Sequence, residues 1–109
     1  MKNWIFGALF ISSVSNMWGQ ARDSVYWTDV EDSLRNKTID LRKKSRFEEA
    51  LLTAKQFAQI AEKNSGPLNT RTADALFLLA TCYRDLGNYD SSEVVLGKAL
   101  SIRKQISGE

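Results

Sequence analysis

The most informative absence in this sequence is histidine, of which the 109 residues contain none. Histidine is the usual general base of enzymes and the commonest metal-binding side chain, so its absence argues against catalytic triads and conventional zinc sites. Glycine-rich phosphate loops, nucleophile motifs and metal-ligand spacings are also missing from the sequence. We therefore expect a protein that is not an enzyme, with no catalytic residue, cofactor or metal of its own.

Cysteine and proline each occur only once, as Cys82 and Pro67. A single cysteine excludes an intrachain disulfide, so packing must stabilise the fold. We expect Cys82 to be a buried structural thiol, because no histidine is available to activate it as a nucleophile. The scarcity of proline and glycine leaves long stretches rich in alanine, leucine, lysine, glutamate and arginine, which favour helices.

The sequence also lacks a strong excess of either charge, since 15 basic and 13 acidic residues give a net charge of +2. This balance does not suggest a surface for nucleic acid or anionic membranes. The one dense basic cluster, Arg42 to Arg46, is interpreted as a solvated helix end, where cations oppose the negative pole of the helix dipole. The alternative interpretation is that this basic cluster binds phosphate or an acidic partner. The pair Glu31-Asp32 falls in the first turn of an expected helix, where negative side chains interact favourably with the positive end of the helix dipole.

Residues 1–20 are typical of a secretory signal peptide. Lys2 precedes the apolar stretch from Trp4 to Ile11, and small and polar residues follow from Ser12. The apolar stretch is shorter than the roughly 20 residues that span a membrane, so a permanent anchor is the weaker alternative. We predict an exported protein, periplasmic or extracellular, without stable membrane insertion after cleavage. Residues 21–30 then form a polar lead-in segment.

The clearest helical pattern lies in the second half of the chain. Apolar or small residues recur at intervals of three and four, as on one face of a helix, at Leu76, Leu79, Ala80 and Tyr83. Gly87 can adopt the left-handed conformation that ends a helix, and Asn88 can cap the next one. Helical spacing resumes after this turn, so residues 72–109 are predicted to form an antiparallel helix hairpin.

The first half repeats this plan over residues 31–71, which include the loop between the two repeats. A thin helical stripe precedes a possible turn at Ser45-Arg46, a stronger stripe starts at Phe47, and Gly66 and Pro67 stop the second helix. Aligning Phe47 with Tyr89 gives a repeat of 42 residues. Self-similarity at such a period indicates a stacked solenoid, so the expected fold class is all-α, an antiparallel helix-hairpin solenoid of about two repeats behind a signal peptide.

The stretch from Ala73 to Asp90 resembles the tetratricopeptide repeat (TPR) family, most closely the kinesin-light-chain-like subgroup with long second helices and long loops. Leu79, Ala80 and Tyr83 stand where the family places a leucine, a small residue and a tyrosine, and Gly87 matches its turn. Among the departures, Leu76 replaces an aromatic residue.

The resemblance implies a scaffold that binds a protein or peptide partner in a groove lined by the first helix of each repeat. Nine residues at matching positions would face this groove: Arg35, Ile39, Arg42, Lys43, Asp74, Phe77, Thr81, Arg84 and Asp85.

Two further hypotheses follow from the small number of repeats, because arrays generally need three or more. The chain could be the docking or sensor part of a larger protein that carries an enzyme, such as the caspase-like peptidases or histidine kinases to which this subgroup is often fused. It could also form a homodimer in which a second copy covers an exposed face of the C-terminal helix, made by Val94, Val95, Ile102 and Ile106.

Overall fold

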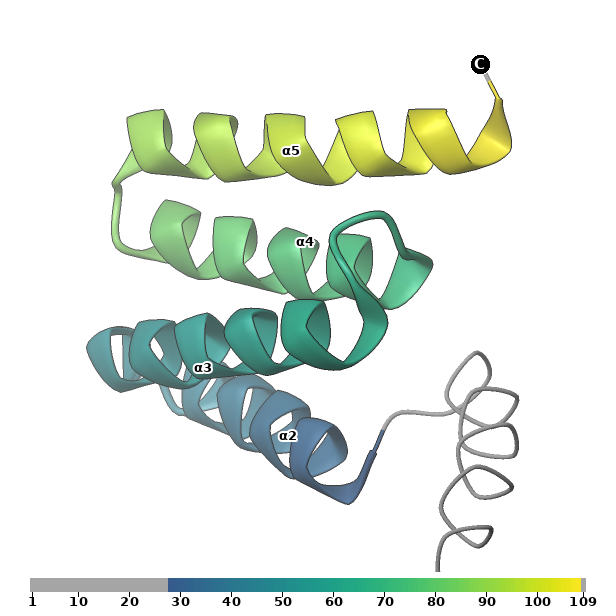
Figure 1. The fold of residues 1–109 in the computed structure, drawn as a ribbon. Helices are drawn as coiled ribbons and strands as arrows, with labels where there is room; N and C mark the ends of the chain where they lie inside the picture. The colour runs from purple at the N-terminus through teal and green to yellow at the C-terminus, as the bar shows by residue number, and fades with distance from the viewer. Residues whose placement is uncertain (1–27, 109) are drawn as a thin grey trace, which may run out of the picture.

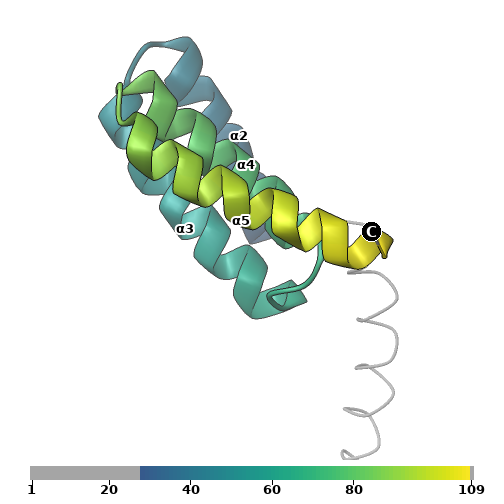
Figure 2. The same ribbon diagram turned by 90° about the horizontal axis from the view of Figure 1, so that it is seen from above.

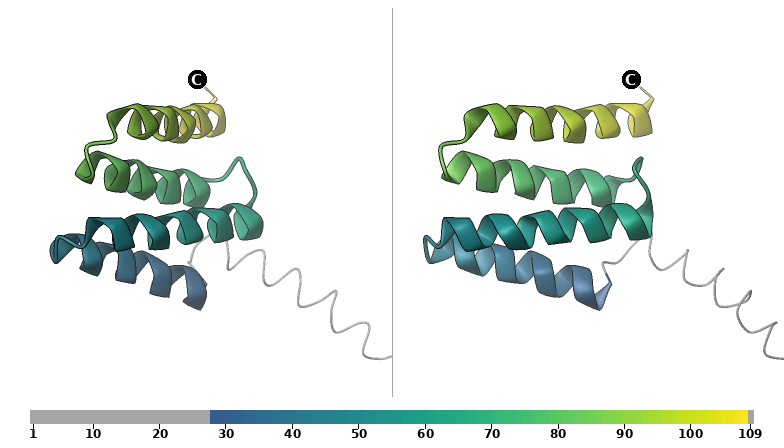
Figure 3. Two further views of the ribbon diagram at one scale, coloured as in Figure 1. Left: turned by 90° about the vertical axis from the view of Figure 1, so that its left-hand side faces the viewer. Right: turned by 60° about the vertical axis from the view of Figure 1, so that its left-hand side comes forward.

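The structure, a computed structural model, describes residues 28–108, and within this range every regular element is an α-helix. The helices are α2 (Asp29–Lys43), α3 (Phe47–Ser65), α4 (Thr70–Asp85) and α5 (Tyr89–Ser107) (Figure 1). Each helix packs on the next one along the chain, so their order in space follows the sequence (Figure 3). This arrangement of two stacked hairpins confirms the expected all-helical fold. The expected signal peptide and most of the lead-in segment lie outside the described residues.

Side chains that accept hydrogen bonds mark three of the helix starts. At α2, Thr28 Oγ1 accepts from the Glu31 amide at 3.2 Å, and Glu31 Oε1 accepts from the Thr28 amide at 2.9 Å, which is a capping box. Asn69 caps α4, and Asn88 caps α5 as expected. Helix α4 begins at Thr70, two residues before the start of the second hairpin expected from the sequence.

The 42-residue repeat is visible in the backbone. Ser45 (φ 60°) and Gly87 (φ 78°), which lie 42 residues apart, adopt positive φ angles in the turns within the two hairpins. Gly66 (φ 88°) and Gly108 (φ 81°), again 42 residues apart, follow the ends of α3 and α5. The two second helices both span 19 residues. The two hairpins therefore turn and end at equivalent positions.

The core between the hairpins is built mainly from alanine. Its buried members are Leu41, Ala50, Ala54, Phe57, Ala58, Ala61, Ala75, Leu79 and Cys82. Short side chains let the helices approach closely, and Phe57 is the largest fully buried side chain. Cys82 is fully buried with its Sγ 3.9 Å from the Ala50 carbonyl oxygen, and burial raises the pKa of its thiol to about 11. The expectation that Cys82 is buried is confirmed.

Candidate functional site

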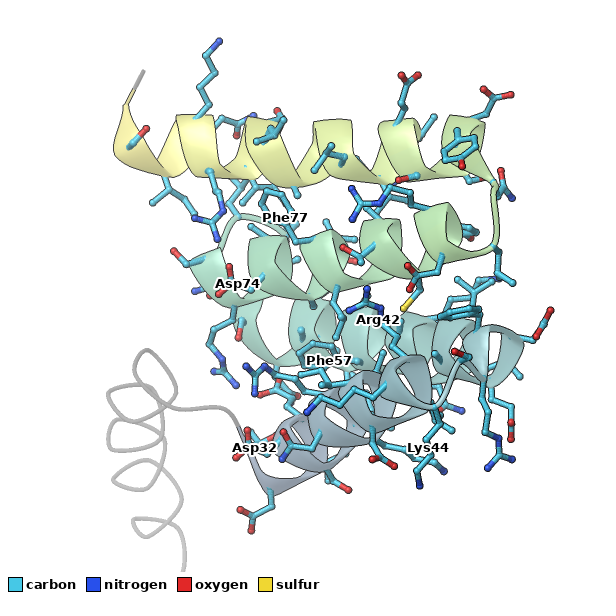
Figure 4. The ribbon with its side chains drawn as sticks, turned by 180° about the vertical axis from the view of Figure 1, so that it is seen from behind. Asp32, Arg42, Lys44, Phe57, Asp74 and Phe77 are labelled. Carbon is cyan, nitrogen blue, oxygen red and sulfur yellow. The ribbon has the colours of Figure 1, made fainter. Side chains whose placement is uncertain are left out.

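A groove of about 350 Å³ lies between the first helices of the two hairpins, on the side of the molecule shown in Figure 4. We call it the α2–α4 groove. Phe57 of α3 forms its floor, and its other lining residues are Arg35, Ile39, Asp74, Phe77, Leu78 and Thr81. Five of the nine residues expected from the sequence therefore line one hollow, although they come from helices about 40 residues apart in the chain.

An ion pair at the C-terminal ends of α2 and α4 fixes one end of this groove. Arg42 Nε lies 2.6 Å from Asp85 Oδ2, and a second contact joins Arg42 Nη2 to Asp85 Oδ1 at 3.4 Å. The hydrogen bond to Asp85 raises the pKa of Arg42, so the guanidinium stays charged. Both residues were expected to face a partner. The structure instead shows that they satisfy one another, so they position the two helices.

A buried polar cluster fixes the other end. Glu31 is completely buried, and its carboxylate forms an ion pair with Arg71 at the start of α4. Glu31 Oε2 also accepts a hydrogen bond from Asn64 Nδ2 of α3 at 3.1 Å. One carboxylate thus joins α2, α3 and α4, in addition to capping α2. Thr28 and Glu31 have the spacing of a capping box, which is readable from the sequence, but no local signal indicates the contacts with Asn64 and Arg71.

The groove combines one available cation with apolar surface. Arg35 makes no ion pair within residues 28–108, and it lies beside Ile39 and Phe77. Asp74 already forms an ion pair with Arg103 of α5, whose guanidinium carbon lies 5.2 Å from the centre of the Phe77 ring. Such a site suits a peptide with an apolar side chain and a carboxylate.

The remaining two candidate residues do not line the α2–α4 groove. Lys43 is exposed in the last turn of α2. Arg84 lines a separate hollow of about 170 Å³ on the α5 side of α4, together with Ala80, Ser92 and Leu96. Phe77 and Thr81 line both hollows, so they form the ridge between them.

The structure corrects the proposed dimer face on the last helix. Ile102 was expected to be exposed, but its side chain is buried against α4, with 9% of its surface accessible. Val94 and Ile106 are exposed, but they line different hollows, of about 520 and 480 Å³. Ile102 therefore cannot belong to an exposed dimer face, although it lines the same hollow as Val94.

Residues 28–108 contain no group of three or more acidic or cysteine side chains placed to hold a metal ion. Within the same range, none of the helices has the length and apolar character required to cross a membrane. The basic cluster expected at a solvated helix end is largely paired: Lys44 Nζ lies 3.0 Å from Asp40 Oδ2, and Arg46 Nε lies 2.5 Å from Glu49 Oε1.

Comparison with known proteins gives two results. A search of curated proteins finds no match. The sequence model of the tetratricopeptide repeat matches residues 29–105, a range that contains nearly all of the four helices. Because this match covers more than half of the sequence and agrees with the stacked helix hairpins, the chain belongs to the tetratricopeptide repeat family.

Proposed function

We propose that this chain is an exported scaffold that binds a peptide or helix of a partner protein in the α2–α4 groove. TPR repeats generally mediate protein–protein interaction. The observation that carries the proposal is the combination of Arg35 with Ile39 and Phe77 in one hollow held between rigid helices. The apolar side chains supply affinity, and the cation selects an acidic residue in the partner.

A crosslinking experiment tests this assignment. A photoreactive amino acid at Ile39 is expected to crosslink the partner in living cells, whereas the same group at Lys43, on α2 but outside the groove, is not. The Arg35→Glu change should reduce the Ile39 crosslink without altering the circular dichroism spectrum, because Arg35 makes no ion pair within the described residues. Equal crosslinking from both positions would show that the partner does not use this groove.

We further propose that the protein acts without chemistry of its own. This rests on the absence of histidine from the sequence and on the burial of Cys82, which keeps its thiol protonated at neutral pH. A hydrolase assay on exported fractions offers the test, and turnover that copurifies with the chain and is lost in the Cys82→Ala variant would contradict the proposal.

The proposed export rests on the composition of residues 1–20, which lie outside the described part of the chain. Expression in a bacterium with two membranes should give a processed protein outside the cytoplasm, with a new N-terminus near residue 21. Sequencing of that N-terminus measures the cleavage site. Recovery of the chain in the cytoplasm with Met1 intact would refute export.

We assign the chain to the kinesin-light-chain-like subgroup as a finer proposal. The 42-residue repeat exceeds the 34 residues of the ordinary TPR, and the second helices are long. Both features are typical of that subgroup. A crystal structure in which the hairpins superpose better on ordinary 34-residue repeats would contradict it.

A further inference from the structure

The two hairpins are equivalent in sequence position, but within residues 28–108 only the first has a further helix packed against the side that faces the next repeat. Helix α4 packs across α3, where Thr72 Oγ1 reaches the Ala61 carbonyl and Cys82 Sγ reaches that of Ala50. The corresponding side of the α4–α5 hairpin is not covered by any described helix (Figures 1 and 2). We call it the open face, and it is lined by Phe77, Arg84, Leu96, Leu100, Arg103 and Ile106.

Apolar side chains on the open face stand at positions that are buried in the first hairpin. Leu100 lies 42 residues after Ala58. The exposed fraction of Leu100 is 52%, whereas that of Ala58 is 7%. Leu96 similarly corresponds to the fully buried Ala54. Hollows of about 170 and 480 Å³ lie toward the two ends of this face. The open face therefore has the position and the apolar character of a helix-packing surface.

The charges on this surface identify the chemistry of a helix that would fit it. Arg84 lies 42 residues after Arg42, at the equivalent place in the last turn of the first helix. Arg42 pairs with Asp85 of the helix that packs over its hairpin, whereas Arg84 is exposed and makes no ion pair within residues 28–108. A helix on the open face would satisfy Arg84 with a carboxylate in its own last turn.

At the opposite end of the open face, a docked helix needs a different side chain from the arginine that α4 carries at the equivalent place. In the first hairpin, Glu31 pairs with Arg71 of the covering helix, and Asn64 donates a hydrogen bond to the same carboxylate. Their equivalents 42 residues later are Ala73 and Ile106, which offer no side-chain partner to an arginine. A helix that docks there must carry an apolar residue where α4 carries Arg71, because an arginine buried against Ala73 and Ile106 would lose its hydration without compensation.

We propose that the open face binds an amphipathic α-helix of a partner protein, parallel to α4, with an apolar residue in its first turn and a carboxylate about 14 residues later. This surface adjoins the α2–α4 groove at Phe77, but Arg84 and Leu100 lie outside that groove, so the inference does not depend on the proposed peptide site. A second copy of the chain is disfavoured by charge. If its α2 packed head to tail on the open face, Lys43, which is equivalent to Asp85, would lie against Arg84.

Arg103 is the one side chain on the open face that a docked helix must displace or accommodate. It corresponds to Ala61, and it reaches across to Asp74 and over the Phe77 ring. Its pairing with Asp74 is solvent-accessible, with the two side chains 46% and 42% exposed. Exposed ion pairs stabilise a protein only weakly, so Arg103 can move aside at low cost.

The experiment uses the full chain and a helical peptide with the sequence of α4, which already occupies the equivalent face of the first hairpin. The peptide comprises residues 70–85 with Arg71→Leu and Cys82→Ala, a fluorescent label, and a lactam bridge between solvent-facing positions to hold it helical. Fluorescence anisotropy measures its dissociation constant. We expect saturable one-to-one binding, and Leu100→Asp in the protein should abolish it while leaving the circular dichroism spectrum unchanged, since Leu100 is 52% exposed.

A charge swap locates the binding site. Arg84→Glu in the protein, or Asp85→Lys in the peptide, should each weaken binding about tenfold, and combining the two should restore it. Lys43→Glu in the protein makes the same change of charge away from the open face and should leave binding unchanged.

Three results would overturn the proposal. The first is an absence of peptide binding by a chain that is folded by circular dichroism. The second is binding that does not respond to Leu100→Asp and Arg84→Glu. The third is concentration-dependent self-association of the chain that Leu100→Asp abolishes, which would make a second copy the occupant.

Discussion

Replacement of Glu31 by leucine should destabilise this protein more than almost any other single change. The Glu31 side chain has no exposed surface, and Arg71 beside it is 6% exposed. Removing the carboxylate breaks the ion pair with the buried Arg71 guanidinium, and it also removes the hydrogen bonds from Thr28 and Asn64. The variant therefore loses the ion pair of a buried arginine and a helix cap.

The magnitude follows from the two losses. Breaking one partner of a buried ion pair costs about 3–5 kcal/mol of unfolding free energy. Loss of the capping box adds about 1 kcal/mol. Changing both Glu31 and Arg71 to leucine removes both buried charges, and such double replacements by apolar residues are often nearly neutral, so we expect the double variant to recover about 2 kcal/mol or more of the loss.

Urea unfolding followed by circular dichroism at 222 nm measures these differences. Asp32→Leu, the same type of change one residue further along α2, is the matched control, because Asp32 is exposed and should cost below about 1 kcal/mol. If Glu31→Leu is unfolded in buffer, a folded double variant still demonstrates the coupling. The reasoning fails if Glu31→Leu costs no more than Asp32→Leu, or if adding Arg71→Leu makes the protein less stable still.

Three further expectations concern the backbone and the thiol. Gly97→Ala in the interior of α5 should raise the unfolding free energy by about 0.5–1 kcal/mol, because nothing lies within 4 Å of an added methyl group. Gly87→Ala should lower it by about 1 kcal/mol, because an alanine is strained at φ 78°; equal effects at both glycines in the same urea experiment would contradict this account. Iodoacetamide should alkylate Cys82 slowly at pH 8 in buffer and rapidly in urea, because burial raises the pKa of the folded thiol from 9.0 to about 11. For the same reason the stability supplied by this thiol is complete below pH 9 and is lost as the pH rises from 9 toward 11, so urea midpoints that do not fall across this range would argue against the shift.

Much of the fold could be predicted because its signals are local. The turn at Gly87 and the cap at Asn88 are decided by residues within one or two turns of helix, and both were recognisable in the sequence. The 42-residue offset between Phe47 and Tyr89 is likewise a property of the chain itself, and the structure turns both hairpins at this spacing. The start of α4 at Thr70 was less apparent, since Asn69 caps it from within a polar loop.

The candidate site could be predicted only in part, because its geometry depends on which helix faces which. Positions along α2 and α4 indicated Arg35, Ile39 and Phe77 as groove residues, and the structure places them around one hollow. The same positions do not reveal that Arg42 and Asp85, 43 residues apart, pair with each other and are therefore occupied. Periodicity assigns a side chain to a face of its helix, but it does not state the partner on that face.

The sequence by itself determined the helix hairpins, their repeat length and the membership of the family, because propensity, capping and apolar spacing act over a few residues. Only the tertiary structure decided that Glu31 meets Arg71 across 40 residues, that Ile102 is buried, and that Arg84, unlike Arg42, has no ion pair within residues 28–108. These features arise from contacts between helices that are distant in the chain, and each contact depends on how the alanine-rich core sets the distance and rotation of its neighbours.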